Sequence, residues 1–273
     1  MAYINGNEIS FLYLDKRGVF INPIKVKEIP IVWSLMTTWG SAIDNSLYIW
    51  TDGENTYYSY GIYQYILDKE TNTWETMTWN GDVTGIEGYY VWKHSGSTYY
   101  SKGSTQYILN KETNTWETMT WNGLTSFYAD RIWKHCGNTY YSYEDQQYIL
   151  NVETHTWTEM TWNGLTSFNG SYIWTDGKST YYSYDSEQYI LKGNNTWETM
   201  TWNGDVTGIK SYYIWKDGGS TYYSKGSEHY ILKSNNTWEV ITCEGLTSFD
   251  GSYIWTDGTN TYYSYNKKTY ILQ

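Results

Sequence analysis

The sequence predicts an all-β protein folded as a six-bladed β-propeller, and three motifs that recur in step carry this prediction. A Tyr/Arg-Ile/Val-Trp motif occurs six times, at spacings of 42, 41, 41, 41 and 40 residues, and its tryptophans are Trp50, Trp92, Trp133, Trp174, Trp215 and Trp255. Thr-Tyr-Tyr-Ser and Tyr-Ile-Leu follow every copy. A fixed period of this length indicates an array of equivalent supersecondary units.

Each repeat holds four short runs rich in β-branched and aromatic residues. In the repeat 164–203 these runs are 171–175, 180–184, 188–191 and 196–202, and Gly, Asn, Asp or Ser separate them. Such punctuation is typical of strands joined by tight hairpins. Four antiparallel strands per unit, repeated six times, predict four-stranded propeller blades. Because neighbouring blades cover both faces of each sheet, the strands are apolar throughout instead of alternating with polar residues.

The two ends of the chain predict how the ring closes. The last repeat stops after its third strand, and Trp33 matches Trp74 with an offset of 41 residues. A strand near Trp33 therefore supplies the fourth strand of the last blade, which removes the open edges of the ring. We expect the propeller to cover residues 29–273, with blades at approximately 41–80, 81–122, 123–163, 164–203, 204–244, and 245–273 plus 29–40.

The preceding residues 1–28 are expected to form a separate β-rich docking or attachment segment. Asn5-Gly6 is a strong signal for a two-residue hairpin turn, and residues 11–14 could pair with residues 19–21 in a second hairpin. The alternative role of this segment is a plug that packs on the propeller.

Composition argues against several classes of function. The formal charge is 18 − 29 = −11, and the only arginines are Arg17 and Arg131, so a surface that binds nucleic acid is not expected. No apolar run approaches the roughly 18 residues that cross a bilayer, and the N-terminus lacks the pattern of a secretory signal. Cys136 and Cys243 occupy unrelated positions of the repeat, so we expect no disulfide between them.

Catalytic, metal-binding and cofactor-binding patterns do not stand out. The recurrent acids repeat in register, which fits turn chemistry better than a unique catalytic pair; they are Asp52, Asp176, Asp217, Asp257, Glu70, Glu112, Glu153, Glu75, Glu117 and Glu198. His94 and His135 occupy equivalent positions of adjacent blades, each after Trp-Lys, and a shared site there stays open as an alternative. No two histidines have the spacing of a metal pair. We therefore expect no catalytic residue, no metal and no cofactor.

The segment 106–117, Gln-Tyr-Ile-Leu-Asn-Lys-Glu-Thr-Asn-Thr-Trp-Glu, resembles the kelch repeat, and the resemblance extends over residues 29–273. It implies a propeller in which Trp74, Trp116, Trp157, Trp197 and Trp238 are core residues. The glycine pair that ends the second kelch strand is replaced here by Ser-Tyr or Ser-Lys, so no kelch partner specificity is implied.

The opening residues 1–9, Met-Ala-Tyr-Ile-Asn-Gly-Asn-Glu-Ile, are similar to the start of tail-associated structural proteins of phages and prophages of Gram-positive bacteria. Repeats of the Trp-Asn-Gly-Leu-Thr-Ser-Phe and Ile-Trp-Thr-Asp-Gly kind are similar to repeats of such proteins as well. This second resemblance implies a place in a virion, in a tail or another component of the particle.

Binding residues are expected on one face of the ring. The turns between the second and third strands vary most between blades and share a face with the long links from blade to blade, whereas the opposite turns are nearly identical. Variable loops on a rigid scaffold indicate a binding surface. The candidate ligand- or partner-binding residues are Trp79, Trp121, Trp162, Trp202, Tyr60, Tyr143, Tyr184 and Tyr265. Exposed tryptophans would stack on sugars; the alternative role of these four is a wedge between adjacent blades.

Together these observations predict a non-enzymatic structural or adhesive propeller of a phage particle. Its N-terminal segment would dock it, and its variable face would bind a host-surface glycan or another virion protein. The expected location is the virion, and otherwise the cytoplasm, without insertion into a membrane. One alternative is an intracellular bacterial kelch-like module that binds a protein partner. A glycan-active enzyme is the third, and the lack of a unique acid pair disfavours it.

Overall fold

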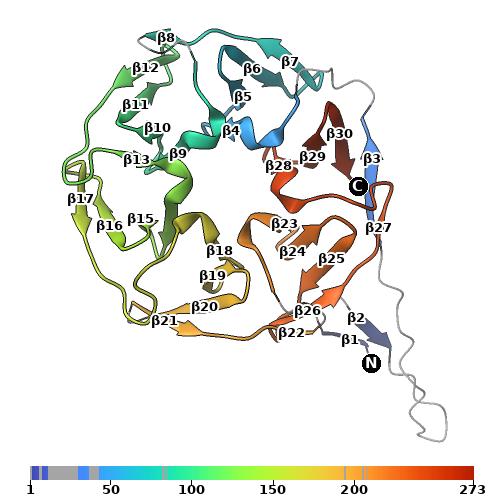
Figure 1. The fold of residues 1–273 in the computed structure, drawn as a ribbon. Helices are drawn as coiled ribbons and strands as arrows, with labels where there is room; N and C mark the ends of the chain where they lie inside the picture. Colours follow the sequence, from blue (N-terminus) through green and yellow to red (C-terminus); the bar gives the residue numbers. More distant parts are fainter. Residues whose placement is uncertain are drawn as a thin grey trace, which may run out of the picture.

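The computed structural model has six sheets arranged as blades around a central axis, which confirms the six-bladed β-propeller (Figure 1). It describes residues 2–5, 8–11, 30–36, 43–81, 83, 85–193, 195–204, 206 and 208–273. Within these ranges the chain forms strands and short 3-10 turns but no α-helix.

In every blade the first strand lies nearest the axis and the last lies at the periphery (Figure 1). From the axis outward, the first blade contains β4 (Ile49–Thr51), β5 (Thr56–Tyr60), β6 (Tyr63–Asp68) and β7 (Thr73–Thr76), and the second contains β9 (Val91–His94), β10 (Ser97–Gly103), β11 (Thr105–Asn110) and β12 (Thr115–Thr118). The third blade contains β14 (Ile132–His135), β15 (Asn138–Tyr143), β16 (Gln146–Asn151) and β17 (Thr156–Glu159), and the fourth contains β18 (Ile173–Thr175), β19 (Thr180–Tyr184), β20 (Glu187–Lys192) and β21 (Thr196–Thr199). The fifth blade contains β23 (Ile214–Asp217), β24 (Ser220–Lys225), β25 (Glu228–Leu232) and β26 (Thr237–Val240), and the sixth contains β28 (Ile254–Thr256), β29 (Thr261–Tyr265), β30 (Lys268–Leu272) and β3 (Ile31–Leu35).

Strand β3 completes the sixth blade, as the match between Trp33 and Trp74 predicts. It pairs antiparallel with β30 and places Trp33 opposite Leu272 and Leu35 opposite Tyr270. The Trp33 side chain is 2% exposed and packs against Trp215 and Phe249, with ring centroids 5.9 Å and 5.5 Å away. The first described strand of the ring is thus joined to the last one by backbone pairing and by a buried aromatic cluster.

The N-terminal residues contain the predicted hairpin, β1 (Ala2–Asn5) and β2 (Glu8–Phe11), and among the described strands these two pair only with each other. The register joins Asn5 to Glu8, so Asn5 belongs to β1 and not to the turn expected from Asn5-Gly6. The second hairpin expected between residues 11–14 and 19–21 falls almost wholly on residues 12–29, outside the described part. The docking role of residues 1–28 and the proposed blade boundaries remain predictions.

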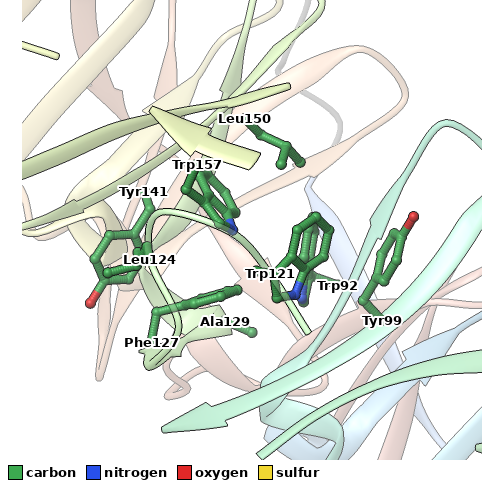
Figure 2. Packing of buried hydrophobic residues seen from close by; sticks show 9 residues of the cluster. All are labelled: Trp92, Tyr99, Trp121, Leu124, Phe127, Ala129, Tyr141, Leu150 and Trp157. Carbon is green, nitrogen blue, oxygen red and sulfur yellow. The ribbon is translucent and has the colours of Figure 1, made fainter. Parts of the chain in front are cut away.

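Tryptophans fill the space between adjacent blades. Between the second and third blades, Trp92, Trp121 and Trp157 form a triangle with centroid separations of 5.6, 6.0 and 6.1 Å (Figure 2). The indole N–H of Trp92 donates to Oγ of Ser101 at 2.9 Å, and the equivalent bond recurs in all six blades. A buried N–H without an acceptor is costly, so this bond explains why serine recurs in Thr-Tyr-Tyr-Ser.

After its fourth strand the chain crosses onto the edge of the next blade. The short strands β8 (Asn80–Gly81), β22 (Asn203–Gly204) and β27 (Cys243–Glu244) pair in parallel with β12, β26 and β3, and single bridges do the same at Asn122 and Asn163. At Gly164, φ is +84° and a Cβ would overlap the carbonyl oxygen of Trp197. Glycine has no Cβ and tolerates positive φ. The recurrent Trp-Asn-Gly segment therefore links neighbouring blades through the backbone.

Candidate functional site

The four tryptophans considered as binding residues are buried between adjacent blades. Trp79, Trp121, Trp162 and Trp202 are 4%, 2%, 2% and 5% exposed. The indole N–H of Trp79 donates to Oε1 of Gln64 at 2.9 Å, and that of Trp202 donates to Gln188 at 3.0 Å. An indole enclosed by two blades offers no face to a ligand, so these positions favour the wedge alternative over the binding role.

The tryptophans that the kelch resemblance assigns to the core mostly lie there. Trp116, Trp157, Trp197 and Trp238 are at most 2% exposed. Trp74 is only partly buried and packs against Trp255 at 6.0 Å, where the first blade meets the sixth.

Exposed large apolar side chains gather on one face of the propeller. In the described part of the chain eleven are exposed, and two of these, Leu35 and Val240, lie on outermost strands. The other nine lie in the links between blades, or in or directly beside the turns between second and third strands; they are Leu47, Tyr60, Ile62, Tyr63, Tyr89, Tyr128, Tyr184, Tyr212 and Tyr265. We call the surface formed by these nine residues the tyrosine-rich face. Scattered apolar residues are ordinary, but a concentration on one face marks an interaction surface.

A ring of 3-10 turns surrounds the axis on this face. The turns directly precede the innermost strands, and each contacts its two neighbours. They are η1 (Ser46–Tyr48), η2 (Gly88–Tyr90), η3 (Ala129–Arg131), η4 (Gly170–Tyr172), η5 (Ser211–Tyr213) and η6 (Gly251–Tyr253). Because they repeat around the axis, they place six equivalent side chains in a circle.

The last residue of each 3-10 turn packs against the residue twelve positions later, at the end of the second strand. In three blades the pair is two tyrosines with centroids 4.3–4.4 Å apart: Tyr48–Tyr60, Tyr172–Tyr184 and Tyr253–Tyr265. In the other three it is a tyrosine and a cation: Tyr90–Lys102, Arg131–Tyr143 and Tyr213–Lys225. The circle therefore presents aromatic rings that are held in place by a partner.

The phenols of the circle are neutral near pH 7. Burial, as the main cause, raises the pKa of Tyr48, Tyr90, Tyr172 and Tyr253 above its usual value, and raises that of Tyr213 to about 12. A neutral phenol both donates and accepts hydrogen bonds.

Two lysines on the same face are paired with acids. Lys102 lies 2.6 Å from Glu87, and Lys210 lies 2.8 Å from Asp185. This part of the face is therefore aromatic, with hydroxyl groups and locally compensated charge.

The third blade departs from the repeat at Asp130 and Arg131. The guanidinium of Arg131 lies 3.5 Å from the ring centroid of Tyr143 and 5.1 Å from that of Tyr128. The hydroxyl of Tyr89 donates to Asp130 at 3.4 Å, and burial raises the pKa of that carboxyl. Among the predicted tyrosines, Tyr60, Tyr184 and Tyr265 are exposed, whereas Tyr143 is partly covered.

Sequence reasoning missed Tyr63, Tyr89, Tyr128 and Tyr212, all of which are exposed on this face. Tyr128 could have been found, because Tyr-Ala-Asp-Arg at 128–131 interrupts an otherwise regular segment. Tyr89 and Tyr212 directly precede the repeated Tyr of the Ile-Trp motif, where no sequence signal separates an exposed ring from a buried one.

On the opposite face three of the four recurrent aspartates stabilise turns, whereas Asp217 accepts a hydrogen bond from Thr261 of the next blade. Oδ1 of Asp52 accepts hydrogen bonds from the backbone N–H groups of Glu54 and Asn55, and Oδ2 accepts one from Tyr57. Asp176 and Asp257 repeat this arrangement. These contacts agree with the turn role inferred from their regular spacing.

Histidines and cysteines form no cluster for a metal within the described residues. Nδ1 of His94 lies 2.7 Å from Oγ1 of Thr139, and Nδ1 of His135 lies 2.9 Å from Oγ1 of Thr180, so each histidine contacts the following blade. Cys136 and Cys243 are both free, and burial raises the pKa of Cys243 to about 11. The part of the chain described here contains no helix long and apolar enough to cross a membrane.

No family model matches the chain, and no curated protein matches it. Several solved structures are similar to the chain. The chain is similar to PorZ, an essential bacterial surface component of the type-IX secretion system of Porphyromonas gingivalis, at 12% identity and a TM-score of 0.49, over 88% of this chain and 32% of PorZ. It is also similar to the extracellular domain of a candidate one-component system of B. thetaiotaomicron, at 8% identity and a TM-score of 0.51, over 82% and 31% of the two chains.

A third similar structure is the virginiamycin B lyase of Staphylococcus aureus, at 10% identity and a TM-score of 0.46, over 98% of this chain and 88% of the lyase. The chain spans about one third of the length of the first two proteins. At 8% identity, the likeness to the extracellular domain shows the fold alone.

Proposed function

We propose that this chain is a non-enzymatic adhesive propeller whose tyrosine-rich face binds a glycan that carries no net negative charge. The observation that supports this proposal is the placement of nine of the eleven exposed large apolar side chains on that face. The glycan would lie across the circle of aromatic pairs around the axis.

The chemistry of the face suits a sugar. Tyrosine rings present flat apolar surfaces to the apolar side of a pyranose, while their hydroxyls reach its polar edge. The stacked partners, such as Tyr172 under Tyr184 at 4.3 Å, already restrict the rings, so less entropy is lost on binding. A protein with a formal charge of −11 repels a polyanion. These points favour a neutral or cationic sugar chain.

The place of the protein in a phage particle belongs to the same proposal. It rests on the resemblance of residues 1–9 and of the repeats to tail-associated proteins, not on the geometry of the ring. In this proposal residues 1–28 attach the propeller to the particle and the tyrosine-rich face points to the host surface. The kelch-like character of the repeats is likewise carried by sequence resemblance.

A protein partner is the second candidate, and the first blade favours it. The turn between β5 and β6 exposes three apolar side chains together: Tyr60 at 47%, Ile62 at 78% and Tyr63 at 57%. An aliphatic residue such as Ile62 adds nothing to sugar stacking but suits an apolar pocket on another protein. Such a partner would be another virion protein, or an intracellular protein if the chain is an interaction module.

A glycan array probed with the full chain separates the two candidates. We expect binding to a subset of neutral or amino-sugar glycans and none to sulfated or sialylated ones. An array without binding, together with capture of one virion protein by the full chain, would contradict the glycan proposal and favour the protein partner.

A further inference from the structure

The second and third blades break the repeat next to the axis, on the face opposite to the tyrosine-rich face. In the first, fourth and sixth blades the innermost strand leads into Trp-Thr-Asp, at 50–52, 174–176 and 255–257. In the second and third blades the corresponding residues are Trp-Lys-His, at 92–94 and 133–135. Two adjacent blades thus replace an acidic position with a histidine and add a lysine beside it.

The backbone brings these basic groups together where the second blade meets the third. Nδ1 of His94 lies 2.7 Å from Oγ1 of Thr139, and Thr139 pairs with Lys134 between β14 and β15, while Lys93 directly precedes His94 on β9. Lys134 is exposed as a whole, but partial desolvation, and then the charge of Lys93, lower its pKa. Burial and then the charge of Lys134 lower the pKa of His94. Both effects disfavour the positively charged forms. In both residues burial is the larger cause, and repulsion by the neighbouring lysine adds to it.

Acidic partners do not offset this repulsion. None of the ion pairs formed among the described residues involves Lys93, His94 or Lys134. Asp52, the acid at the equivalent position of the first blade, accepts hydrogen bonds from its own turn and from Tyr57. A concentration of positive groups without a counter-charge is unexpected in a protein with 29 acidic and 18 basic residues.

The available hydrogen-bond donors define what could bind. Each lysine brings three N–H donors and no acceptor. Nδ1 of His94 is engaged with Thr139 at 2.7 Å, which leaves Nε2 for a ligand. His135 lies at the edge of the cluster, because its Nδ1 contacts Thr180 and its Nε2 lies 3.2 Å from Sγ of Cys136. Two ammonium groups and one imidazole suit a divalent oxyanion with several acceptor oxygens.

We propose that Lys93, His94 and Lys134 form a binding site for a phosphate group near the axis. The site lies on the opposite face from the proposed glycan surface and is independent of it. An oxyanion there supplies the missing counter-charge and links the second and third blades. The phosphate group belongs either to the free inorganic ion or to a phosphomonoester.

Imidazole NMR signals test this proposal directly, because the chain has only four histidines. The full chain is titrated with inorganic phosphate, with glycerol 3-phosphate and with acetate at constant ionic strength. We expect a saturable shift of the His94 signals with both phosphates and a much weaker response to acetate. His229, which is buried and stacked on Phe249 at 4.4 Å, serves as the internal reference and should not shift. Tighter binding of glycerol 3-phosphate than of inorganic phosphate would mean that the site recognises a phosphomonoester. Equal binding of the two would mean that it recognises the phosphate group alone.

Threonine variants provide the matched controls, since threonine occupies the equivalent position in three blades. Lys93→Thr and Lys134→Thr should each weaken phosphate binding by about tenfold, equivalent to about 1.4 kcal/mol. Lys216→Thr removes the corresponding lysine of the fifth blade, which is followed by Asp217, and should change the affinity by less than about twofold. The proposal is overturned if His94 shows no saturable shift, if acetate binds as well as phosphate, or if Lys216→Thr weakens binding as much as Lys134→Thr.

Discussion

Alanine in place of Gly164 should lower the free energy of unfolding by more than about 4 kcal/mol, a loss that only severe core or backbone defects produce. Two effects add at this position. The backbone has φ of +84°, which a residue with a Cβ adopts at a cost of about 1–2 kcal/mol. The new Cβ would also overlap the carbonyl oxygen of Trp197. The chain can relieve this overlap only by breaking the backbone link to the next blade. Urea-induced unfolding measures the loss.

Gly177 provides the matched control for this prediction. Its φ is +96°, but nothing lies within 4 Å of the position that a Cβ would take. Gly177→Ala should therefore cost only the conformational strain, about 1–2 kcal/mol. Equal losses for the two variants would mean that strain alone accounts for the effect and that the close approach to the next blade is unimportant.

Removal of residues 1–36 should abolish cooperative folding, because it takes away β3. The sixth blade would keep three strands, and β30 would expose its edge to solvent. The deletion also removes Trp33, which is 2% exposed, and loss of a buried tryptophan side chain alone costs about 3–5 kcal/mol. With total stabilities of about 5–15 kcal/mol, the open ring should aggregate or unfold without a sharp transition, as monitored by near-UV circular dichroism.

The shorter deletion of residues 1–28 retains β3 and should unfold cooperatively, with a melting temperature near that of the full chain. A well-folded protein lacking residues 1–36 would contradict the role of β3 in closing the ring. Loss of folding in the shorter deletion would instead favour a plug that packs on the propeller.

The number of blades and the closure of the ring could be predicted because the same motifs occur in every repeat. Six tryptophan-marked motifs fix the number of blades, and the match between Trp33 and Trp74 identifies the strand that closes the ring. Within the N-terminal hairpin the expected turn position at Asn5 was wrong, because Asn5 pairs with Glu8 and continues the strand that joins Ile4 to Ile9.

The site was harder to predict because exposure depends on the neighbouring blade. Trp202 follows β21 in the link to the next blade and Tyr184 ends β19, yet the first is 5% and the second 37% exposed. Trp202 points between two sheets and finds an acceptor on Gln188, whereas Tyr184 lies on top of Tyr172. No periodicity within one repeat contains this information. The variation of the turns between blades nevertheless singled out the face on which most of the exposed aromatic side chains lie, and its binding role stays a prediction.

The central claim is that the tyrosine-rich face binds the ligand, and the most direct test is the affinity of a triple variant. Tyr60, Tyr184 and Tyr265 are replaced by lysine, which the second and fifth blades already carry at the equivalent positions, as Lys102 and Lys225. The control is a variant with lysine at Leu35 and Val240, which are exposed on outermost strands.

Titration calorimetry with the glycan selected on the array gives the decisive measurement. Aromatic contacts contribute roughly 0.5–1.5 kcal/mol each, so the triple variant should bind the glycan at least about tenfold more weakly. The control variant should bind it like the unmodified chain. Unchanged affinity in the triple variant, or an equal loss in the control, would contradict the assignment of this face.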